Sequence, residues 1–198
     1  MPISSYVPSS AISRAGVCTS STRPASPYEG QTIYETDTDL YRFWDGAAWK
    51  IFAGKMPTCI IRTATVQSGI PQDTWTQATF PSTIIDINRG GFTISNGTIT
   101  IPSGMGGIYH VAGQMQWDSN TSGGRGCGFA ATSNITQTIV SYTAAGGFSY
   151  MRCSFSGIAS LTEGVTYCMT LIQGGSGGNR STEPFYMPNT LSITMLNP

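Results

Sequence analysis

Carboxylates offer the most obvious chemistry in this sequence, and four of them gather in the stretch ETDTDLYRFWDG at residues 35–46. They are Glu35, Asp37, Asp39 and Asp45. A calcium loop alternates acidic residues and places Gly at its sixth position, whereas the sixth residue counted from Glu35 is Leu40. A glycosidase pair is defined by distance in space, which spacing along the chain does not give. We therefore interpret these acids as hairpin-turn residues that accept hydrogen bonds from nearby N–H groups.

No other pattern predicts catalysis. The single histidine, His110, has no acidic or nucleophilic motif beside it and is interpreted as a packed strand residue. The Gly-rich stretches at 103–107 and 173–179 match no phosphate-binding fingerprint, and GxSxG does not occur. The cysteines lack CxxC spacing and are predicted to be buried free thiols: Cys18, Cys59, Cys127, Cys153 and Cys168. We expect no enzyme, no metal site and no cofactor.

Composition favours an all-β protein and excludes two kinds of partner. Only 10% of residues are charged, against about 25% in an average soluble domain. The 24 glycines indicate many turns. Basic and acidic residues balance both before and after residue 55, so no cluster of cations predicts nucleic-acid binding. No apolar run is long enough for a membrane helix, and the N-terminus lacks the apolar core of a signal peptide.

The chain divides into three predicted parts. Residues 1–27, rich in Ser and Pro, are expected to form an extended N-terminal arm. Residues 28–55 alternate polar and apolar positions around two turn signals, DTD and DG, which predicts a small three-stranded β-meander. Three short strands are not stable alone in water, so the aromatic residues of the meander need a surface to cover.

Residues 58–198 read as a succession of short strands. An Asn-Gly turn signal at 96–97 separates two alternating runs, and prolines fall at the edges of runs. No stretch longer than a few residues has a helical period. Eight or more strands at this spacing indicate a β-sandwich or jelly-roll head domain.

This second part resembles the jelly roll of complement heads and tumour necrosis factors. The stretches that carry the resemblance are INRGGFTISNGTITIPSGMGGIYHVAGQMQW, FSGIASLTEGVTYCMTLIQGG and the final TLSITML. The matching positions are Phe92, Ile99, Ile101, Pro102, Gly107, Tyr109, Val111, Ser156, Gly157, Leu161, Gly164 and Tyr167. Val165 replaces the acidic residue that usually follows the last glycine. The resemblance implies a homotrimer with aromatic and aliphatic contacts along its axis, and it assigns Tyr109, Val111 and Tyr167 to the trimer interface.

Residues 23–49 resemble a short element found in structural proteins of tailed bacteriophages, particularly tail, fibre and appendage proteins. The matching positions are Arg23, Pro24, Pro27, Gly30, Gln31, Tyr34, Glu35, Thr36, Asp37, Trp44, Asp45, Gly46 and Trp49. The resemblance implies a docking or collar element, to which large aromatic faces are well suited. We assign docking and assembly to Tyr28, Tyr34, Tyr41, Trp44, Trp49 and Phe52.

Ligand contacts are expected where aromatic and arginine residues occur in loops, because these types anchor most recognition surfaces. The candidates are Trp117, Asp118, Asn120, Arg125, Tyr142, Tyr150 and Arg180. Two alternatives stay open: Trp117 as a core residue, and Tyr142 and Tyr150 as trimer contacts.

The sequence therefore predicts a non-enzymatic virion protein of a tailed bacteriophage, assembled in the host cytoplasm. Its N-terminal part would attach it to other virion proteins of the tail or capsid, and its trimeric jelly-roll head would contact a host-surface glycan or protein. The alternatives are a capsid decoration or head-fibre protein, a glycan-cleaving spike and a secreted lectin-like module. No nucleic acid and no membrane insertion are expected.

Overall fold

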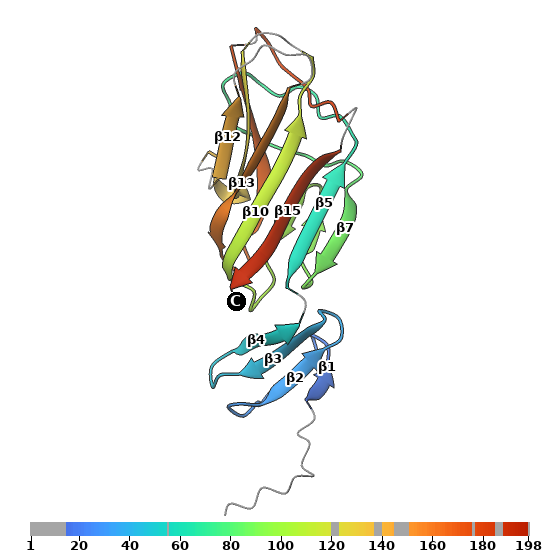
Figure 1. The fold of residues 1–198 in the computed structure, drawn as a ribbon, viewed down its shortest axis with the longest axis vertical. Helices are drawn as coiled ribbons and strands as arrows, with labels where there is room; N and C mark the ends of the chain where they lie inside the picture. Colours follow the sequence, from blue (N-terminus) through green and yellow to red (C-terminus); the bar gives the residue numbers. More distant parts are fainter. Residues whose placement is uncertain are drawn as a thin grey trace, which may run out of the picture. The chain divides into compact units, whose positions relative to one another are not determined.

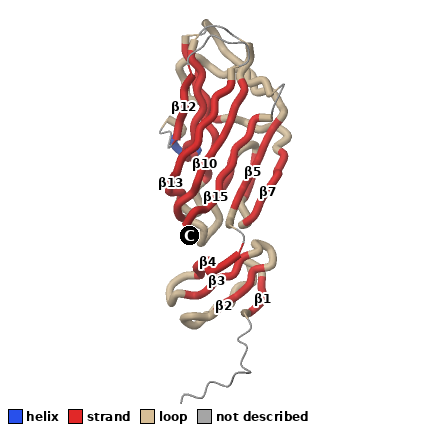
Figure 2. Tube along the Cα trace, in the orientation of Figure 1, coloured by secondary structure: helices blue, strands red, loops and turns tan. Residues whose placement is uncertain are grey.

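The computed structural model of the 198-residue chain describes residues 15–54, 56–119, 123–136, 140–144, 151–175, 177–184 and 188–197. Of residues 52–54, 140–144 and 197 it describes the backbone alone. The chain forms two compact units, Met1–Gly54 and Lys55–Pro198, which we call the small unit and the large unit. Both are built from strands (Figures 1 and 2).

The small unit is one mixed sheet with the order β1-β2-β3-β4. Its strands are β1 (Gly16–Cys18), β2 (Thr32–Glu35), β3 (Leu40–Trp44) and β4 (Trp49–Gly54). Strands β2 to β4 form the predicted antiparallel meander. The sheet has four strands rather than three, because β1, which lies in the predicted arm, pairs in parallel with β2.

The large unit is a sandwich of two sheets (Figure 1). One sheet has the order β13-β10-β15-β5-β7, and the other has the order β12-β11-β14-β9-β8, with β6 also pairing β14. The strands of the first sheet are β5 (Thr58–Thr63), β7 (Ile84–Arg89), β10 (Gly107–Gln116), β13 (Arg152–Leu161) and β15 (Asn189–Asn197). Those of the second are β6 (Thr76–Gln77), β8 (Thr93–Ser95), β9 (Thr98–Thr100), β11 (Gly124–Ala131), β12 (Val140–Ala144) and β14 (Thr166–Gly174). The single helical element among the described residues is a 3-10 turn, Thr132–Asn134.

The core lies between the two sheets, and strand alternation decides which residues enter it. On β10, Tyr109, Val111, Gly113 and Met115 are buried, whereas His110, Ala112 and Gln114 between them are half-buried. The opposite sheet contributes Phe129 and Tyr167, whose rings stack with centroids 5.5 Å apart. Burying side chains of this size stabilises the fold by roughly 1.5–3 kcal/mol each.

The Asn-Gly turn predicted from the sequence closes the hairpin of β8 and β9. Asn96 and Gly97 have φ angles of 44° and 84°. A two-residue hairpin loop of type I′ requires a positive φ at both central positions. A Cβ atom on Gly97 would lie 3.0 Å from Phe80. Glycine is therefore needed here both for its conformation and for its lack of a side chain.

Candidate functional site

The outward side of three strands of the five-stranded sheet, β10, β13 and β15, is nearly uncharged, and we call it the sheet face. It consists of the outward residues of β10, β13 and β15: Ile108, His110, Ala112, Gln114, Arg152, Ser154, Ser156, Ile158, Ser160, Thr190, Ser192, Thr194 and Leu196. Arg152, at the start of β13, is the one Arg, Lys, Asp or Glu in these three strands. Soluble surfaces usually carry more charge than this, so the face is suited to burial against protein.

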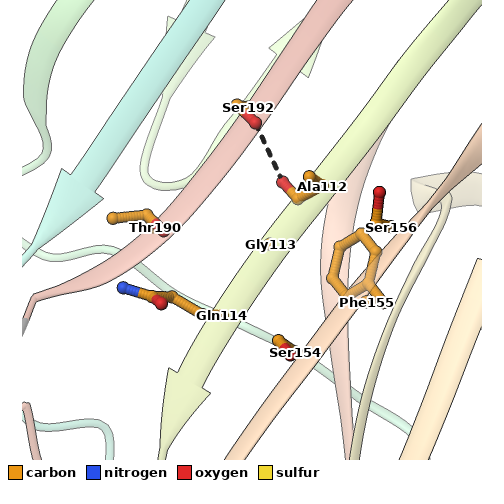
Figure 3. Close-up of a pocket in the computed structure, with 8 residues that line it drawn as sticks. All are labelled: Ala112, Gly113, Gln114, Ser154, Phe155, Ser156, Thr190 and Ser192. Atoms are coloured by element: carbon orange, nitrogen blue, oxygen red, sulfur yellow. Dashed lines mark hydrogen bonds between the residues drawn. The ribbon is translucent and has the colours of Figure 1, made fainter.

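A shallow cavity of about 330 Å³ lies at the middle of the sheet face (Figure 3). It is lined by Ala112, Gly113, Gln114, Ser154, Phe155, Ser156, Thr190 and Ser192. Most of the outward side chains here are small: Ala112, Ser154, Ser156, Thr190 and Ser192. The Ser192 hydroxyl donates to the Ala112 carbonyl 3.3 Å away. A Cβ atom on Gly113 would lie 2.6 Å from the ring of Phe155, so no larger residue fits there without rearrangement.

The strands that line this cavity also carry solvent-exposed apolar side chains. Ile158 is 66% exposed, and Leu196 and Ile108 are also exposed. Ile158 pairs with His110 across β13 and β10. The His110 ring nitrogen Nε2 lies 2.8 Å from the Ser156 hydroxyl, so the imidazole has a neutral hydrogen-bond partner on the face.

The residues assigned to the trimer interface are not on this face, and that assignment is wrong. Tyr109 and Val111 have no exposed surface, and Tyr167 is 4% exposed. The Tyr109 hydroxyl donates to the Met105 carbonyl at 2.6 Å, and the Tyr167 hydroxyl accepts from the Thr162 amide at 2.9 Å. Tyr109 and Val111 lie on β10, a strand of the sheet face, whereas Tyr167 lies on β14 of the other sheet. Successive strand residues point to opposite sides of a sheet. These three point inward.

Four of the predicted ligand contacts come together at one end of the sandwich. Trp117 follows β10 and bonds the Met151 carbonyl through its amide. Asp118 is joined by two hydrogen bonds to Ser181, the neighbour of Arg180. The Asp118 amide donates to the Ser181 carbonyl, and the Ser181 amide donates to the Asp118 carboxylate. The Arg125 guanidinium carbon lies 5.9 Å from the centre of the Trp117 ring, within cation–π range.

This cluster does not present the surface anchors that the sequence predicted. Trp117 is fully buried and Arg125 is 1% exposed, so the core alternative is correct for Trp117. Burial lowers the pKa of Arg125, and Arg180 lowers it further. Asp118 and Arg180 are half-buried. Asn120, Tyr150 and the side chain of Tyr142 lie outside the described residues.

A second cavity, of about 210 Å³, lies next to this cluster and was not predicted from the sequence. Its lining residues are Asp73, Trp75, Gly124, Arg125, Ile172, Gln173 and Gly174. Residues 72–77 run along β14 and bring Trp75 and Asp73 there. A tryptophan in the polar stretch PQDTWTQ was the available signal.

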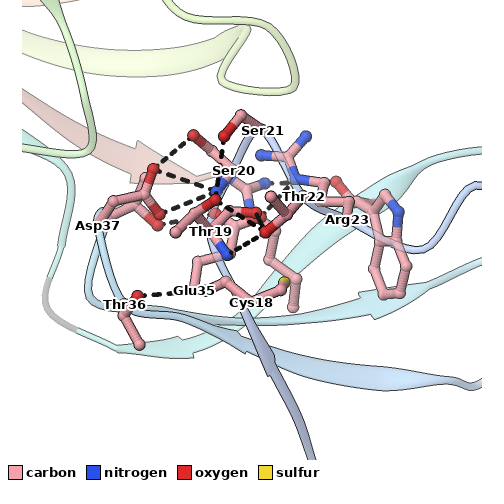
Figure 4. A network of polar contacts seen from close by, with 12 residues as sticks. Cys18, Thr19, Ser20, Ser21, Thr22, Arg23, Glu35, Thr36 and Asp37 are labelled. Carbon is pink, nitrogen blue, oxygen red and sulfur yellow. Dashed lines mark hydrogen bonds and ion pairs between the residues drawn. The ribbon is translucent and has the colours of Figure 1, made fainter.

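A network of polar contacts that includes buried charges joins the segments of the small unit (Figure 4). The Glu35 carboxylate is fully buried and accepts hydrogen bonds from Arg23 at 2.5 Å, Thr38 at 2.7 Å and Arg42 at 2.9 Å. Burial alone would raise the pKa of Glu35, but these partners outweigh it and the pKa lies below its usual value. Asp37 in turn fixes the Ser20 amide and hydroxyl, which holds the segment after β1 on the sheet.

One side of the small sheet presents apolar and aromatic residues to solvent. Val17, Tyr34 and Tyr41 are register neighbours across β1, β2 and β3, and we call this row the aromatic row. Val17 is 71% exposed and Tyr41 43% exposed, while Tyr34 packs on Tyr41 with centroids 4.8 Å apart. Tyr28, in the preceding loop, is also 71% exposed.

The two tryptophans of the small unit are less available for docking. Trp44 and Trp49 pair across β3 and β4 and touch edge to face, with ring centroids 5.5 Å apart. Trp49 is 8% exposed, which makes it part of the interior of the unit. The side chain of Phe52 lies outside the described residues.

Among the described residues, no helix is long and apolar enough to cross a membrane. In the same residues no group of three or more His, Cys, Asp or Glu side chains could hold a metal ion.

Comparison with known proteins identifies the fold of the large unit. No protein-family model matches the chain, and no curated protein matches it. Among solved structures, murine APRIL at pH 5.0 is 14% identical with a TM-score of 0.51, over 72% of this chain and 100% of that one. Eiger TNF from S. frugiperda is 12% identical with a TM-score of 0.50, over 71% of this chain and 92% of that one. At such identities the similarity concerns the fold alone, and it confirms the predicted tumour-necrosis-factor-like jelly roll.

Proposed function

We propose that this chain is a structural virion protein of a tailed bacteriophage. Its small unit attaches it to the particle, and its large unit forms a homotrimeric head that serves adhesion to the host surface. The assignment to a phage rests on the sequence resemblance of residues 23–49. The assembly rests on the sheet face, whose exposed Ile158 and central cavity are the observation that carries the proposal.

The sheet face supports self-assembly through its lack of charge and its shape. In a symmetric trimer, equivalent residues of identical chains approach one another around the axis. Like charges at short distance there would oppose association. Here the cavity offers room for a side chain from the next copy, and the exposed Ile158 follows the lining residue Ser156 by two positions on β13. On β5 and β7 of the same sheet, Arg62 and Asp86 form an ion pair, with 2.8 Å between Arg62 Nε and Asp86 Oδ1, so their charges compensate each other.

A charge placed on the sheet face tests the assembly. Ile158→Asp should convert the trimer to a monomer, because each copy would bring a carboxylate into an apolar contact. Val66→Asp is the matched control, since Val66 is 50% exposed and lies in the loop after β5 rather than on the face. Light scattering during gel filtration measures the mass. If Ile158→Asp and Val66→Asp elute with the same mass, the sheet face is not the interface.

The aromatic row and Tyr28 are the surface that we assign to attachment. Tyr28→Ala with Tyr41→Ala should reduce the amount of protein in purified particles, while the protein itself stays folded because both side chains are exposed. Glu29→Gln is a matched control on an exposed neighbour. Immunoblots of particles measure incorporation. Full incorporation of the double variant would refute the attachment role.

The position on the particle separates adhesion from capsid decoration. Gold-labelled antibody against residues 58–198, imaged on intact virions, should mark the tail. Label over the head would instead identify a decoration or head-fibre protein with the same fold.

A further inference from the structure

We propose that the cavity beside Trp75 is a binding site for a neutral sugar ring. The inference deepens the proposed adhesive role and rests on it for its biological meaning. The binding itself can be measured on isolated protein.

Part of the cavity is lined by glycine backbone and by apolar side chains, and the rest by Asp73, Arg125 and Gln173. Gly124 and Gly174 pair across β11 and β14 and contribute no side chains, which leaves the hollow. Trp75 is half-buried, so one part of its indole remains accessible. Together with Ile172 it gives an apolar wall, against which the C–H face of a sugar ring packs well.

One polar group at the cavity accepts hydrogen bonds. Asp73 is exposed and lies at the rim, where its Oδ1 is 2.8 Å from the place that a Cβ atom on Gly174 would occupy. Asp73 has a φ of 55°, in the left-handed region, and its backbone amide donates a hydrogen bond to the Gln173 carbonyl at 2.7 Å. Gln72 donates to its other carboxylate oxygen at 2.9 Å. The carboxylate is therefore fixed and keeps Oδ1 for a hydroxyl donor.

The second polar group is a donor without an acceptor. Arg125 is 1% exposed and lines the cavity, and its Nη1 bonds the Gly124 carbonyl at 2.9 Å. Its Nη2 has no hydrogen-bond partner among the described residues. A buried guanidinium nitrogen without a partner is costly, and an oxygen supplied by a ligand would satisfy it. Because Nη2 is covered, this contact requires the rim to move slightly when the ligand enters.

Charge balance selects the class of ligand. A cation would be repelled by Arg125 and an anion by Asp73, whereas a neutral molecule with several hydroxyl groups can donate to one and accept from the other. The volume of about 210 Å³ suits a single ring rather than a long chain. A neutral monosaccharide unit, such as one terminal residue of a surface glycan, has no net charge, carries several hydroxyl groups and is a single ring.

Saturation-transfer NMR on the full-length protein tests the site with named sugars. The probes are D-glucose, D-galactose, D-mannose, L-rhamnose and N-acetyl-D-glucosamine at about 10 mM, which would nearly fill a site with a Kd of about 1 mM. D-glucuronate is the charged partner of D-glucose. We expect transfer to at least one neutral sugar and weaker transfer to glucuronate.

Two variants locate the binding. Asp73→Asn keeps the shape and tolerates the same backbone region, and it should weaken the neutral sugar about tenfold through loss of a charged acceptor. Trp75→Ala should abolish transfer, and Met56→Ala, at a 47% exposed position that does not line the cavity, is the control. No transfer to any neutral sugar overturns the proposal, as does binding that Asp73→Asn and Trp75→Ala leave unchanged. Binding of glucuronate alone, strengthened by Asp73→Asn, would identify an anion site and also overturn it.

The mass of the same sample by light scattering separates this inference from the proposed function. A trimer that binds no sugar refutes the sugar site and leaves the assembly standing. A monomer that binds sugar refutes the assembly alone.

Discussion

Replacing Glu35 with Gln should unfold the small unit and leave the large unit folded. The Glu35 carboxylate joins Arg23, Thr38 and Arg42, and both Glu35 and Arg42 have almost no exposed surface. Gln has the same shape, but its amide nitrogen is a donor facing donors, and Arg42 loses the charge that compensates its burial.

The magnitude follows from burial and from the size of the unit. Removing one partner of a buried ion pair costs about 3–5 kcal/mol. A unit of roughly 40 residues has a free energy of unfolding of about 2–6 kcal/mol at typical values per residue. The substitution therefore removes most or all of the stability of the small unit.

Hydrogen exchange followed by mass spectrometry measures each unit separately. Peptides from residues 28–54 should lose protection in Glu35→Gln, and peptides from β10 should keep theirs. Glu29→Gln removes the same charge from an exposed position of the same unit and should change neither set. If the two variants exchange alike in residues 28–54, the network does not hold the unit together.

Three further predictions concern pH, packing and thiol reactivity. Because the pKa of Glu35 is lowered in the folded state, its stabilisation is present above the unfolded pKa and is lost as pH falls through the folded pKa. Protection factors of residues 28–54, which correct for the slower intrinsic exchange in acid, should therefore fall below about pH 4 in the wild-type protein, and protection factors that do not change with pH would contradict this. Gly113→Ala should lower the melting temperature of the large unit by roughly 4 °C or more through contacts at 2.6–2.7 Å with Phe155 and Met169; Ser160→Ala, exposed on the adjacent strand, is the control, and equal melting of the two would refute the packing argument. Burial raises the pKa of Cys59 and of Cys168 to about 12, and Cys18 is the half-buried exception among the five cysteines. Burial and the Glu35 carboxylate raise the pKa of Cys18 as well, but its thiol is only half-buried. An aromatic disulfide reagent at pH 8 should therefore titrate Cys18 before the others, which react only after denaturation, and a second thiol that reacts in the folded protein would contradict the burial.

The sequence was sufficient to predict the class of fold, because strand alternation and turn residues are local signals. The Asn96–Gly97 hairpin is an example, since its residue types alone require the observed turn. The two-sheet jelly roll followed from short motifs spread along β9, β10, β13 and β14, and the structural neighbours confirm it.

The face that a residue occupies was harder to predict. Tyr109 and Val111 were assigned to an interface by resemblance, although the alternation with His110, Ala112 and Gln114 along β10 points them inward. Arg125 stands between glycines in GRGCG, which suggested a loop, but it lies in β11 with 1% exposure. Both corrections come from packing, which local patterns record only as alternating residue types.

Contacts between distant segments could not be read from the sequence at all. The cavity beside Trp75 forms because residues 72–77 cross onto β14, about a hundred positions further along the chain. The fourth strand of the small unit likewise depends on parallel pairing between β1 and β2 and on the reach of Asp37 to Ser20. Such long-range pairings are set by the whole fold.

The most direct test of the account is the mass of the purified full-length protein, measured by light scattering at micromolar concentration. A homotrimer predicts three times the 21.0 kDa of the single chain. A value near 21.0 kDa itself would contradict the assembly on which the proposed function depends.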